Sequence, residues 1–538
     1  MSMELNDALG QWTQILGAGG VLDETSAQMA YGRCTIGVER RILGALKARD
    51  AAEIPAIVEV AARCRVPLYP ISTGRNWGYG TALPVRDGCV ILDLSGLNRI
   101  LDFDAESGLV TLEPGVTQGM LADFLDKGGH PFLVPVTGAG PTCSLVGNAL
   151  ERGYGITPHA DHFGAVTALE AVLADGSVYR PALSGMNGEA LDRAFKWGIG
   201  PYLDGIFTQS GMGVVTKMSL ALAPRPECVK AFLFGLDEPE RIRDVVPLVR
   251  AVLARYPGVV GAVNLMNAHR VLAMSVDYPR GRLGADGLIP PAVIAELGRG
   301  QQVMPWTGFG TIYGSRGVVK AAAREIRQIL KPLAKRLVFL SPELVDRLRW
   351  VAAWLPAGIK EKVAKRLDML ARSLQLVAGR PNEMALPLCY WQGGKVPPPG
   401  QAMDPARDGC GLMWYAPLVL MKSEQVSEYV AMVEKIMHEY RLEPLITLTS
   451  ISDRCFDSTV PLLFDVASED SRRNAEACYW ALLKAGRDRG FLPYRVGIQT
   501  MDWISEGGGT YWQLVRQIKD VLDPHNILAP GRYERRDV

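Results

Sequence analysis

The sequence lacks the features that direct a chain to a membrane or to nucleic acid. No stretch reaches about 18 consecutive apolar residues, so a transmembrane helix is not expected. The N-terminus, MSMELNDALGQW, has no basic segment followed by an apolar run, so no secretory signal is expected. Lysine and arginine total 58 against 57 aspartates and glutamates, a balance that gives no reason to expect a polyanionic partner. We therefore expect a cytoplasmic protein with neither a membrane nor a nucleic acid as partner.

Metal-binding and common nucleotide-binding motifs are also absent. The nine cysteines contain no C-x-x-C pair, which favours reduced thiols over a disulfide framework. Only six histidines occur, and the pair His159 and His162 lies in a stretch with Gly155 and Pro158, so no metal site is expected. The sequence has no P-loop, no G-x-G-x-x-G between a strand and a helix, and no G-x-S-x-G elbow. These absences exclude the usual P-loop ATPase, Rossmann dehydrogenase and serine hydrolase.

The chain is long and its composition is typical of a globular protein. With 538 residues, 48% apolar and 21% charged, two substantial domains are expected. Apolar spacing predicts helices at 52–65, 117–128, 318–337 and 424–440, and strands at 66–72, 88–100 and 109–116, the last two joined by a turn. Asp175-Gly176 predicts a hairpin within 164–180. The segment 379–411 is rich in proline and glycine, and it is either a functional lid or a plain surface excursion.

Two loops rich in small residues carry the first functional signal. The segment 72–80, STGRNWGYG, follows an apolar strand, and glycine at such positions lets backbone N–H groups approach a phosphate. Alone, this segment is weak evidence, because a glycine-rich turn between strands has the same composition. A second loop, 138–149, reads GAGPTCSLVGNA. Two such loops suit an extended ligand with a pyrophosphate and flat rings.

Four ordered motifs resemble the vanillyl-alcohol oxidase/p-cresol methylhydroxylase family of FAD flavoproteins. They are STGRNWGYG, GNALERGYGITPHADHFG, FKWGIGPYLDGIFTQSGMGVVTKM and LDPHNILAPGRY. The resemblance implies an α+β fold, with a two-subdomain FAD-binding domain over 1–228, a cap domain with an antiparallel sheet and flanking helices over 229–489, and a C-terminal return over 490–538. It implies FAD as the cofactor. The residues expected to bind it are Ser72, Thr73, Gly74, Arg75, Asn76, Pro141, Thr142, Ser144, Gly147, Asn148, Gly205, Ile206 and Arg532.

The resemblance also implies a phenolic substrate. Tyr79, Tyr494 and Arg495 match the family residues that hold a phenolate, and Asp161 matches an acidic residue close to flavin N5 that acts as a base. Ionising a para-substituted phenol pushes electrons toward the benzylic carbon as a hydride leaves for the flavin, giving a quinone methide. Arg532 matches a cation near the pyrimidine end of the flavin. Without the resemblance, each of these side chains reads as a structural tyrosine, a turn aspartate or a surface arginine.

The sequence departs from the family in the cap. The position that tethers FAD in many members falls on or near Leu412, and no histidine is close, although Cys410 and Tyr415 are nearby nucleophiles. We therefore expect non-covalent FAD. The stretch 453–456 replaces a histidine pair of the family, so the resemblance does not determine the cap side of the substrate pocket or the exact substrate.

Several alternatives remain at this point. The substrate is a 4-alkylphenol or a 4-hydroxybenzylic alcohol, or else a non-phenolic alcohol or biosynthetic intermediate. The electron acceptor is dioxygen, a cytochrome or another carrier. A catalytically silent flavin-binding protein is a further reading, because the cap motif is lost. A homodimer is implied by the resemblance alone.

Overall fold

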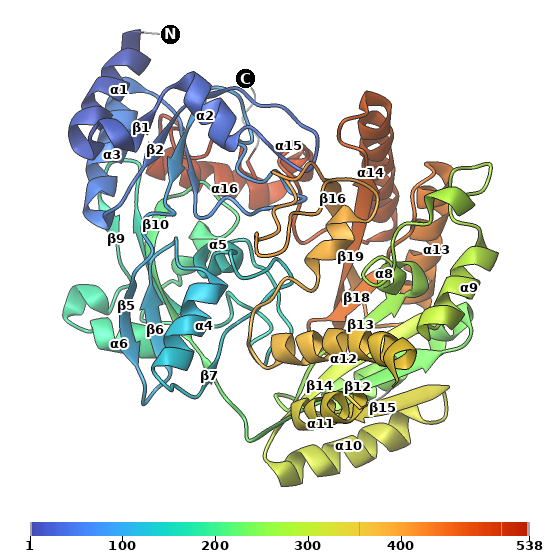
Figure 1. Cartoon of the computed structure of the whole chain (residues 1–538). Coiled ribbons are helices and arrows are strands. Elements are labelled where there is room, and N and C mark those ends of the chain that lie inside the picture. The colour runs from blue at the N-terminus through green and yellow to red at the C-terminus, as the bar shows by residue number, and fades with distance from the viewer. Residues whose placement is uncertain (1–2, 355, 507, 535–538) are drawn as a thin grey trace.

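The computed structural model describes residues 3–354, 356–506 and 508–534, and it contains three main sheets with helices around them. Figure 1 shows the two smaller sheets on one side of the molecule and the largest sheet on the other. Mixed helices and largely antiparallel strands confirm the expected α+β class.

The first sheet is small, four-stranded and mostly parallel, in the order β1-β2-β4-β3. Its central strand β4 is buried along its whole length because it has parallel neighbours on both edges. Helices α1 and α3 pack on it through a shared apolar cluster. The elements are α1 (Met3–Leu16), β1 (Val21–Leu22), α2 (Glu24–Tyr31), β2 (Ile42–Lys47), α3 (Ile54–Cys64), β3 (Leu68–Ile71) and β4 (Cys89–Asp93).

Helix α3 shows how the sequence sets these elements. The Asp50 and Glu53 side chains form a capping box before it, and Pro55 lies in its first turn. Its buried face follows helical spacing, and the chain leaves the helix at Arg65 in the left-handed conformation, with φ 53°. It delivers the chain into β3, whose end opens the 72–80 loop.

The second sheet is antiparallel and five-stranded, in the order β5-β6-β10-β8-β9. Helix α4 covers one of its faces through a compact apolar cluster. Its elements are β5 (Ile100–Asp104), β6 (Leu109–Leu112), α4 (Gln118–Lys127), α5 (Leu145–Leu150), β8 (Val166–Val172), β9 (Val178–Tyr179), α6 (Glu189–Ala194) and β10 (Val214–Ala221); β7 (Phe132–Leu133) pairs separately with β11 (Ala223–Pro224).

The cap sheet is antiparallel and eight-stranded, in the order β15-β12-β14-β13-β18-β19-β16, with β17 also pairing with β19. Alternate residues of β12 (Cys228–Leu236) face opposite layers: Phe232 and Phe234 pack with α7 and α10, whereas Ala231 and Leu233 pack with α11 and α12. The other strands are β13 (Val260–Asn267), β14 (Trp306–Gly314), β15 (Arg336–Leu340), β16 (Gly411–Tyr415), β17 (Leu418–Leu420), β18 (Thr447–Ser450) and β19 (Cys455–Phe464). The helices are α7 (Ile242–Arg255), α8 (Ala268–Leu272), α9 (Pro291–Gln301), α10 (Arg316–Leu330), α11 (Pro342–Ala352), α12 (Ala357–Val377), α13 (Ser423–Glu439) and α14 (Glu469–Arg489).

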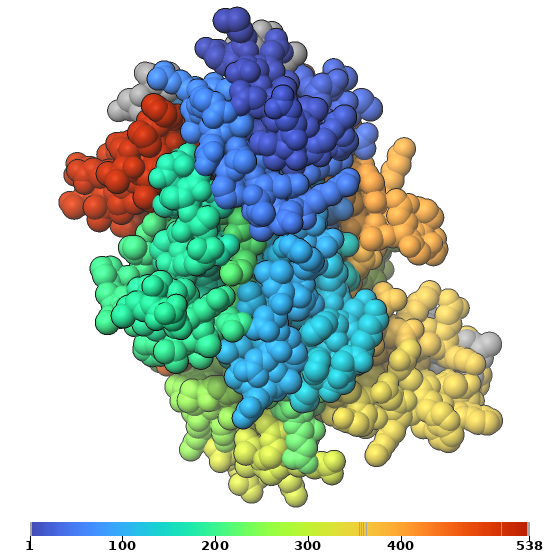
Figure 2. All heavy atoms as spheres, turned by 90° about the vertical axis from the view of Figure 1, so that its left-hand side faces the viewer, coloured from blue at the N-terminus to red at the C-terminus, as the bar shows by residue number. Residues whose placement is uncertain are grey.

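The C-terminal residues pack against the first sheet. Leu68 of β3 donates its N–H to Ile527 O (2.7 Å) and accepts from Ala529 N (2.8 Å). Helix α16 (Gly509–Leu522), preceded by α15 (Met501–Ser505), packs on the apolar cluster of the second sheet, and Figure 2 shows the red C-terminal residues against the blue and green ones. The division at 228 and 489 stays a prediction; the nearest element bounds are Cys228 and Arg489.

Most predicted elements form, with two differences. The hairpin at Asp175-Gly176 is β8–β9, and the helices expected at 52–65, 117–128 and 424–440 are α3, α4 and α13. The strands predicted at 88–100 and 109–116 do not pair with each other: β4 belongs to the first sheet, whereas β6 pairs with the intervening β5. The helix predicted at 318–337 ends at Leu330, and Arg336 begins β15.

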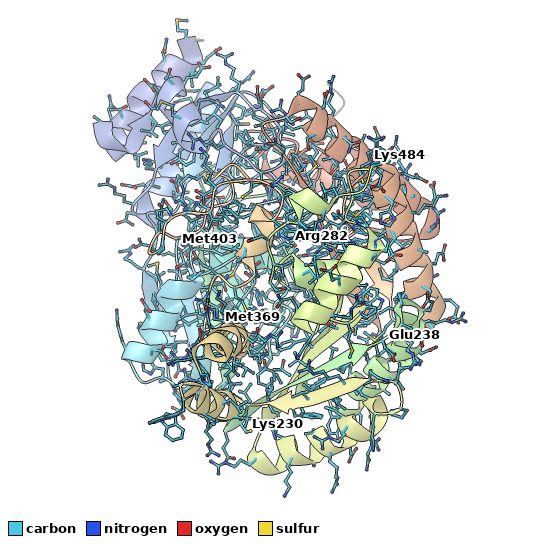
Figure 3. The ribbon with its side chains drawn as sticks, turned by 45° about the vertical axis from the view of Figure 1, so that its right-hand side comes forward. Lys230, Glu238, Arg282, Met369, Met403 and Lys484 are labelled. Carbon is cyan, nitrogen blue, oxygen red and sulfur yellow. The ribbon has the colours of Figure 1, made fainter. Side chains whose placement is uncertain are left out.

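The segment 379–411 contains one short 3-10 turn, at Leu386–Tyr390, and it spans the two halves of the molecule. Figure 3 labels Met403 in this segment, above α12, which carries Met369. Within the described ranges, no helix is long and apolar enough to cross a membrane.

Candidate active site

A cavity of about 390 Å³ lies where the two small sheets, the cap sheet and the C-terminal residues meet. The 72–80 and 138–149 loops form one side of it, and Leu412, Trp414 and Thr459 of the cap strands form another. The 379–411 segment closes part of it with Ala385, Leu386, Leu388 and Cys389.

The 72–80 loop is shaped by glycine. Gly74 and Gly78 have φ of 65° and 79°, in the left-handed region that favours glycine. A Cβ on Gly78 would lie 2.1 Å from the Trp414 ring, and Trp414 donates its backbone N–H to Gly78 O at 3.2 Å. The cap is thus seated directly on this loop, and a larger residue at 78 would separate the two.

The second loop touches the first. Ser144 caps α5 by accepting from Gly147 N (2.9 Å), and its hydroxyl donates to Pro114 O (2.6 Å). A Cβ on Gly147 would lie 2.4 Å from Ser72 Oγ. The two loops therefore approach so closely that position 147 has no room for a side chain. Glycine backbone and small side chains line the cavity at this point.

Most of the residues predicted to bind the cofactor line this cavity, and four do not. Those that line it are Ser72, Thr73, Gly74, Arg75, Asn76, Ser144, Gly147, Asn148 and Arg532. The four outside the lining are Pro141, Thr142, Gly205 and Ile206, although their neighbours Cys143 and Phe207 do line it. Arg75 is ion-paired with Asp404 of the 379–411 segment, so its charge is shared with that segment.

Tyr79 and Arg495 lie together at one end of the cavity, although 416 positions separate them in sequence. The Arg495 guanidinium carbon lies 4.3 Å from the centre of the Tyr79 ring. Arg495 also donates to Asn76 Oδ1, and its Nε lies 3.1 Å from Glu151 Oε2. This guanidinium is the cationic centre of the cluster.

Tyr494 lies beside this pair but outside the cavity lining, close enough for Tyr79 and Arg495 both to affect the pKa of its hydroxyl. Its ring contacts Tyr154, with centroids 5.5 Å apart, and its backbone N–H is held by Ala416 O of the cap (3.2 Å). Burial raises the pKa of both Tyr79 and Tyr494 above the usual tyrosine value. Both hydroxyls therefore stay protonated at neutral pH and are available as hydrogen-bond donors.

Asp161 is placed differently from these three. It is exposed, its Oδ1 accepts from Gly164 N at 2.8 Å, and it lies outside the cavity lining. It is close enough to Tyr154 to contribute to raising the pKa of that phenol. Because the Tyr154 ring contacts Tyr494, Tyr154 links Asp161 to the cluster. Its role as a base stays a prediction.

Asp457 lies next to Arg495 but outside the cavity lining, and sequence reasoning missed it. It lies in β19, burial raises its pKa well above the usual value, and its Oδ1 has no hydrogen-bond partner among the described residues. Arg495 opposes this shift, and Asp457 in turn raises the pKa of Tyr494. A carboxyl group kept neutral beside two tyrosines can donate a hydrogen bond to an oxyanion. The one signal in the sequence was an acidic residue in the middle of an otherwise apolar strand, CFDSTVPLLF.

Glu151 links the two arginines predicted to hold the phenolate and the flavin. It pairs with Arg495 and also with Arg532, whose Nη1 donates to Tyr69 Oη at 2.8 Å. Two arginines therefore share one carboxylate, which leaves net positive charge at the inner wall of the cavity.

Comparisons with known proteins agree with this geometry. The model of the FAD binding domain matches residues 42–181, and that of the C-terminal domain of FAD linked oxidases matches 423–533. The chain is 35% identical to 1'-carboxy-chondrochloren decarboxylase of Chondromyces crocatus, over 99% of this chain and 98% of that one. The chain belongs to the vanillyl-alcohol oxidase/p-cresol methylhydroxylase family.

Two further relatives place the chain more closely within this family. It is 29% identical to the 4-cresol dehydrogenase [hydroxylating] flavoprotein subunit of Pseudomonas putida, over 98% of this chain and 95% of that one. A solved structure of p-cresol methylhydroxylase with substrate bound matches with a TM-score of 0.86 and 28% identity, covering 99% and 97% of the two chains. The protein is an FAD-dependent oxidoreductase with the two-part FAD-binding domain and cap of this fold.

The residues present fit FAD. The two loops, whose approach excludes any side chain at Gly147, line the cavity with glycine backbone and with the Ser72 and Thr73 hydroxyls, the kind of donors that a pyrophosphate needs. Arg532 and Arg495 add positive charge deeper in the cavity, where an anionic reduced flavin would be stabilised.

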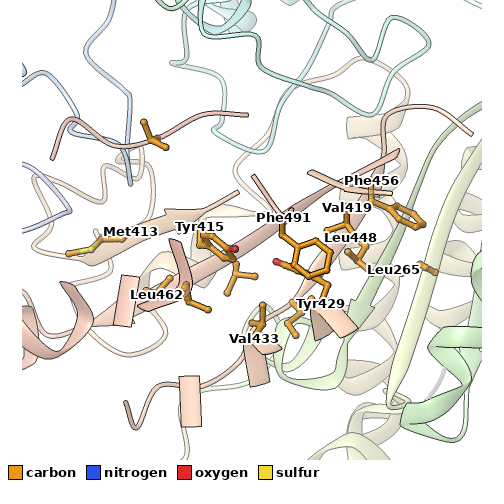
Figure 4. Packing of buried hydrophobic residues seen from close by; sticks show 14 of the residues in the cluster. Leu265, Met413, Tyr415, Val419, Tyr429, Val433, Leu448, Phe456, Leu462 and Phe491 are labelled. Atoms are coloured by element: carbon orange, nitrogen blue, oxygen red, sulfur yellow. The ribbon is translucent and has the colours of Figure 1, made fainter. Parts of the chain in front are cut away.

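The nucleophiles nearest the family's tethering position face away from the cavity. Figure 4 shows Tyr415 among apolar side chains of the cap core, and a Cβ on Gly486 of α14 would lie 2.2 Å from its hydroxyl. Cys410 is fully buried, its Sγ lies 2.4 Å from where a Cβ on Gly394 would be, and burial raises the pKa of its thiol. Leu412, which has no nucleophile, occupies the cavity wall between them.

We therefore expect FAD to be released when the protein is precipitated with acid. The yellow colour should move into the supernatant, because neither Tyr415 nor Cys410 reaches the cavity. Colour that remains in the pellet after washing, and that follows one tryptic peptide, would contradict non-covalent binding. Cys389 lines the cavity, so the variant Cys389→Ser serves as a control for a tether at that position.

Proposed function

We propose that the protein oxidises a para-substituted phenol by hydride transfer, with the phenolate held by Tyr79, Tyr494 and Arg495. The observation that carries the proposal is the contact of the Arg495 guanidinium with the Tyr79 ring in the cavity lining, with Tyr494 beside them just outside that lining. A phenolate is an oxyanion with a flat ring, and donors fixed before it binds stabilise it without reorganisation. The relatives named for 4-cresol and p-cresol support a phenolic substrate.

The residues contribute to the reaction by stabilising charge. Bound FAD supplies the two-electron acceptor for the hydride. Arg495 lowers the pKa of the substrate phenol, so the phenolic proton passes to water and electron density moves to the benzylic carbon. Tyr79 and Tyr494 donate to the phenolate oxygen, and burial, which raises the pKa of Asp457, disfavours an opposing negative charge there. As the benzylic C–H bond breaks, its electron pair leaves with the hydride and the substrate becomes a quinone methide.

Two outcomes follow from the quinone methide. Addition of water to the benzylic carbon restores the phenol and gives a 4-hydroxybenzylic alcohol, whereas a substrate that already carries a benzylic hydroxyl loses its proton and gives a carbonyl. Asp161 is the proposed acceptor of that proton, through Tyr154 or a water molecule, since its carboxylate is exposed behind Tyr154. Dioxygen or an electron carrier such as a cytochrome would reoxidise the flavin. We also propose that the protein is a homodimer, as the family resemblance implies.

Decarboxylation is a second candidate, and the relative of 35% identity named as a decarboxylase favours it. The first step is the same. If the carbon next to the benzylic carbon carries a carboxylate, its C–C bond breaks and carbon dioxide leaves. The bonding pair becomes a new C=C bond, and the ring returns to a phenolate, giving a 4-hydroxystyrene.

Anaerobic mixing with a matched panel tests the proposal. We expect 4-ethylphenol and 4-hydroxybenzyl alcohol to bleach the visible flavin absorbance, and their respective phenolic methyl ethers, 4-ethylanisole and 4-methoxybenzyl alcohol, to leave it unchanged. Bleaching by the ether, or by a non-phenolic alcohol alone, would move the assignment to a non-phenolic substrate. A flavin that no alcohol or phenol bleaches, but that dithionite reduces, would mark the protein as catalytically silent.

A further inference from the structure

One arginine of the cap lines the cavity and has a side-chain donor without a partner. Arg270, on α8, lines the cavity, and its Nε donates to Thr447 Oγ1 at 2.9 Å. Its Nη1 is buried and has no hydrogen-bond partner, and Arg270 forms no ion pair with any residue in the described ranges. Burial lowers its pKa to about 10, so the guanidinium is still charged at neutral pH. A buried cation without a counter-charge is unfavourable, and an anion entering the cavity would offset that cost.

The position of Arg270 relative to the phenolate residues follows from strand register. Thr447, its partner, pairs across the sheet with Thr459, which also lines the cavity. Asp457 lies two residues along β19 on the same face as Thr459, about 7 Å away at the usual strand rise. Arg270 therefore lines the same cavity as Tyr79 and Arg495, from the neighbouring part of the cap sheet.

The anion that Arg270 meets has two possible sources, the cofactor and the substrate. The loops suited to the pyrophosphate belong to the two small sheets, whereas Arg270 and Thr447 belong to the cap. Trp414 lies between them: its ring packs on Gly78, and the Arg270 guanidinium carbon lies 6.0 Å from the ring centre. This arrangement favours the substrate side of the cavity.

We infer that Arg270 binds a carboxylate carried by the alkyl side chain of the phenolic substrate. The inference rests on the proposed phenol oxidation and narrows its substrate class to 4-hydroxyphenyl carboxylic acids, of which 3-(4-hydroxyphenyl)propanoate is the simplest with a two-carbon spacer. Phenolate and carboxylate would then be held at opposite ends, with the benzylic carbon fixed between them.

Equilibrium binding tests this inference separately from turnover. The probes are 3-(4-hydroxyphenyl)-3-methylbutanoate, whose benzylic carbon has no hydrogen to transfer, and its primary amide. Both are titrated into the oxidised holoenzyme and followed by the change in the flavin spectrum. We expect the acid to bind about tenfold to a hundredfold more tightly than the amide. In Arg270→Gln the ratio should fall to near one, and in Arg270→Lys it should be intermediate.

The ratio of acid to amide separates recognition from structural damage, because a distorted pocket would weaken both probes alike. Arg280→Gln is the matched control: Arg280 is exposed and donates to Gln392 O, so its removal should leave the wild-type ratio. Equal binding of acid and amide by the wild type would overturn the inference. So would an Arg270→Gln variant that loses FAD while keeping the ratio, since the anion would then be on the cofactor. If the panel of phenols fails to bleach the flavin, only the proposed function is contradicted. The ratio of acid affinity to amide affinity still decides whether Arg270 binds a carboxylate.

Discussion

Replacing Arg495 with methionine should slow anaerobic flavin reduction by 4-ethylphenol about 10²–10³-fold, the usual effect of removing one donor to a developing oxyanion. Arg495 is the cation of the phenolate cluster, 4.3 Å from the Tyr79 ring centre. Without it, the substrate phenol keeps its proton, and the hydride has to leave a less electron-rich carbon. Stopped-flow measurement of flavin bleaching gives the rate at saturating phenol.

Two further variants sharpen this prediction. Arg495→Lys keeps the charge and loses the planar fork, so the rate should fall by a smaller factor. Arg489→Met removes a partly exposed arginine that donates to Ala485 O within α14. The flavin of this variant should be reduced at the wild-type rate. The flavin content of each variant is measured from its absorbance ratio. If Arg495→Met holds a full complement of FAD and is reduced as fast as the wild type, the phenolate does not depend on this residue.

Replacing Lys519 with methionine should lower the free energy of unfolding by about 3–5 kcal/mol, the typical cost of breaking a buried ion pair from one side. Lys519 and Asp523 side chains are each 1% exposed, and their charged atoms lie 2.7 Å apart. Lys519 also donates to Gly211 O and Leu528 O, both at 2.7 Å, which fastens α16 to the second sheet and to the C-terminal residues. The variant leaves the Asp523 carboxylate buried without its cation.

Urea unfolding of the holoenzyme, followed by flavin release and by tryptophan fluorescence, measures this loss. The double variant Lys519→Met/Asp523→Leu should recover part of the stability, because the buried charge is removed together with its partner. Lys335→Met is the control, since that lysine is 67% exposed and should change stability by less than about 1 kcal/mol. An Lys519→Met variant as stable as this control would show that the pair does not hold the C-terminal residues in place.

The parts of the fold set by local sequence were the easiest to predict. The 72–80 and 138–149 loops depend on glycine backbone freedom, and nine of the predicted cofactor residues do line the cavity. Strand pairing was less accessible, because apolar alternation indicates a strand but not its neighbour. The segment 88–100 therefore looked like the partner of 109–116, although β4 joins the first sheet with β2 and β3.

Site residues contributed singly by the cap could not be found from sequence. Asp457 and Arg270 acquire their chemistry from distant partners, Arg495 for one and Thr447 for the other. Neither stands in a motif, and each becomes notable only because burial leaves a polar atom unpartnered. Asp161 shows the converse: its motif was plain, but the structure places its carboxylate at the surface rather than in the cavity.

Whether the bound phenol is ionised tests the central claim most directly. The ligand is 4-tert-butylphenol, which has no benzylic hydrogen, and the ultraviolet difference spectrum is recorded at neutral pH, well below the usual phenol pKa of about 10. Binding to the wild type should produce phenolate absorption, and binding to Arg495→Met should leave the spectrum of the neutral phenol. A ligand that binds the wild type and keeps its neutral spectrum would contradict the assignment of Tyr79, Tyr494 and Arg495 as the phenolate site.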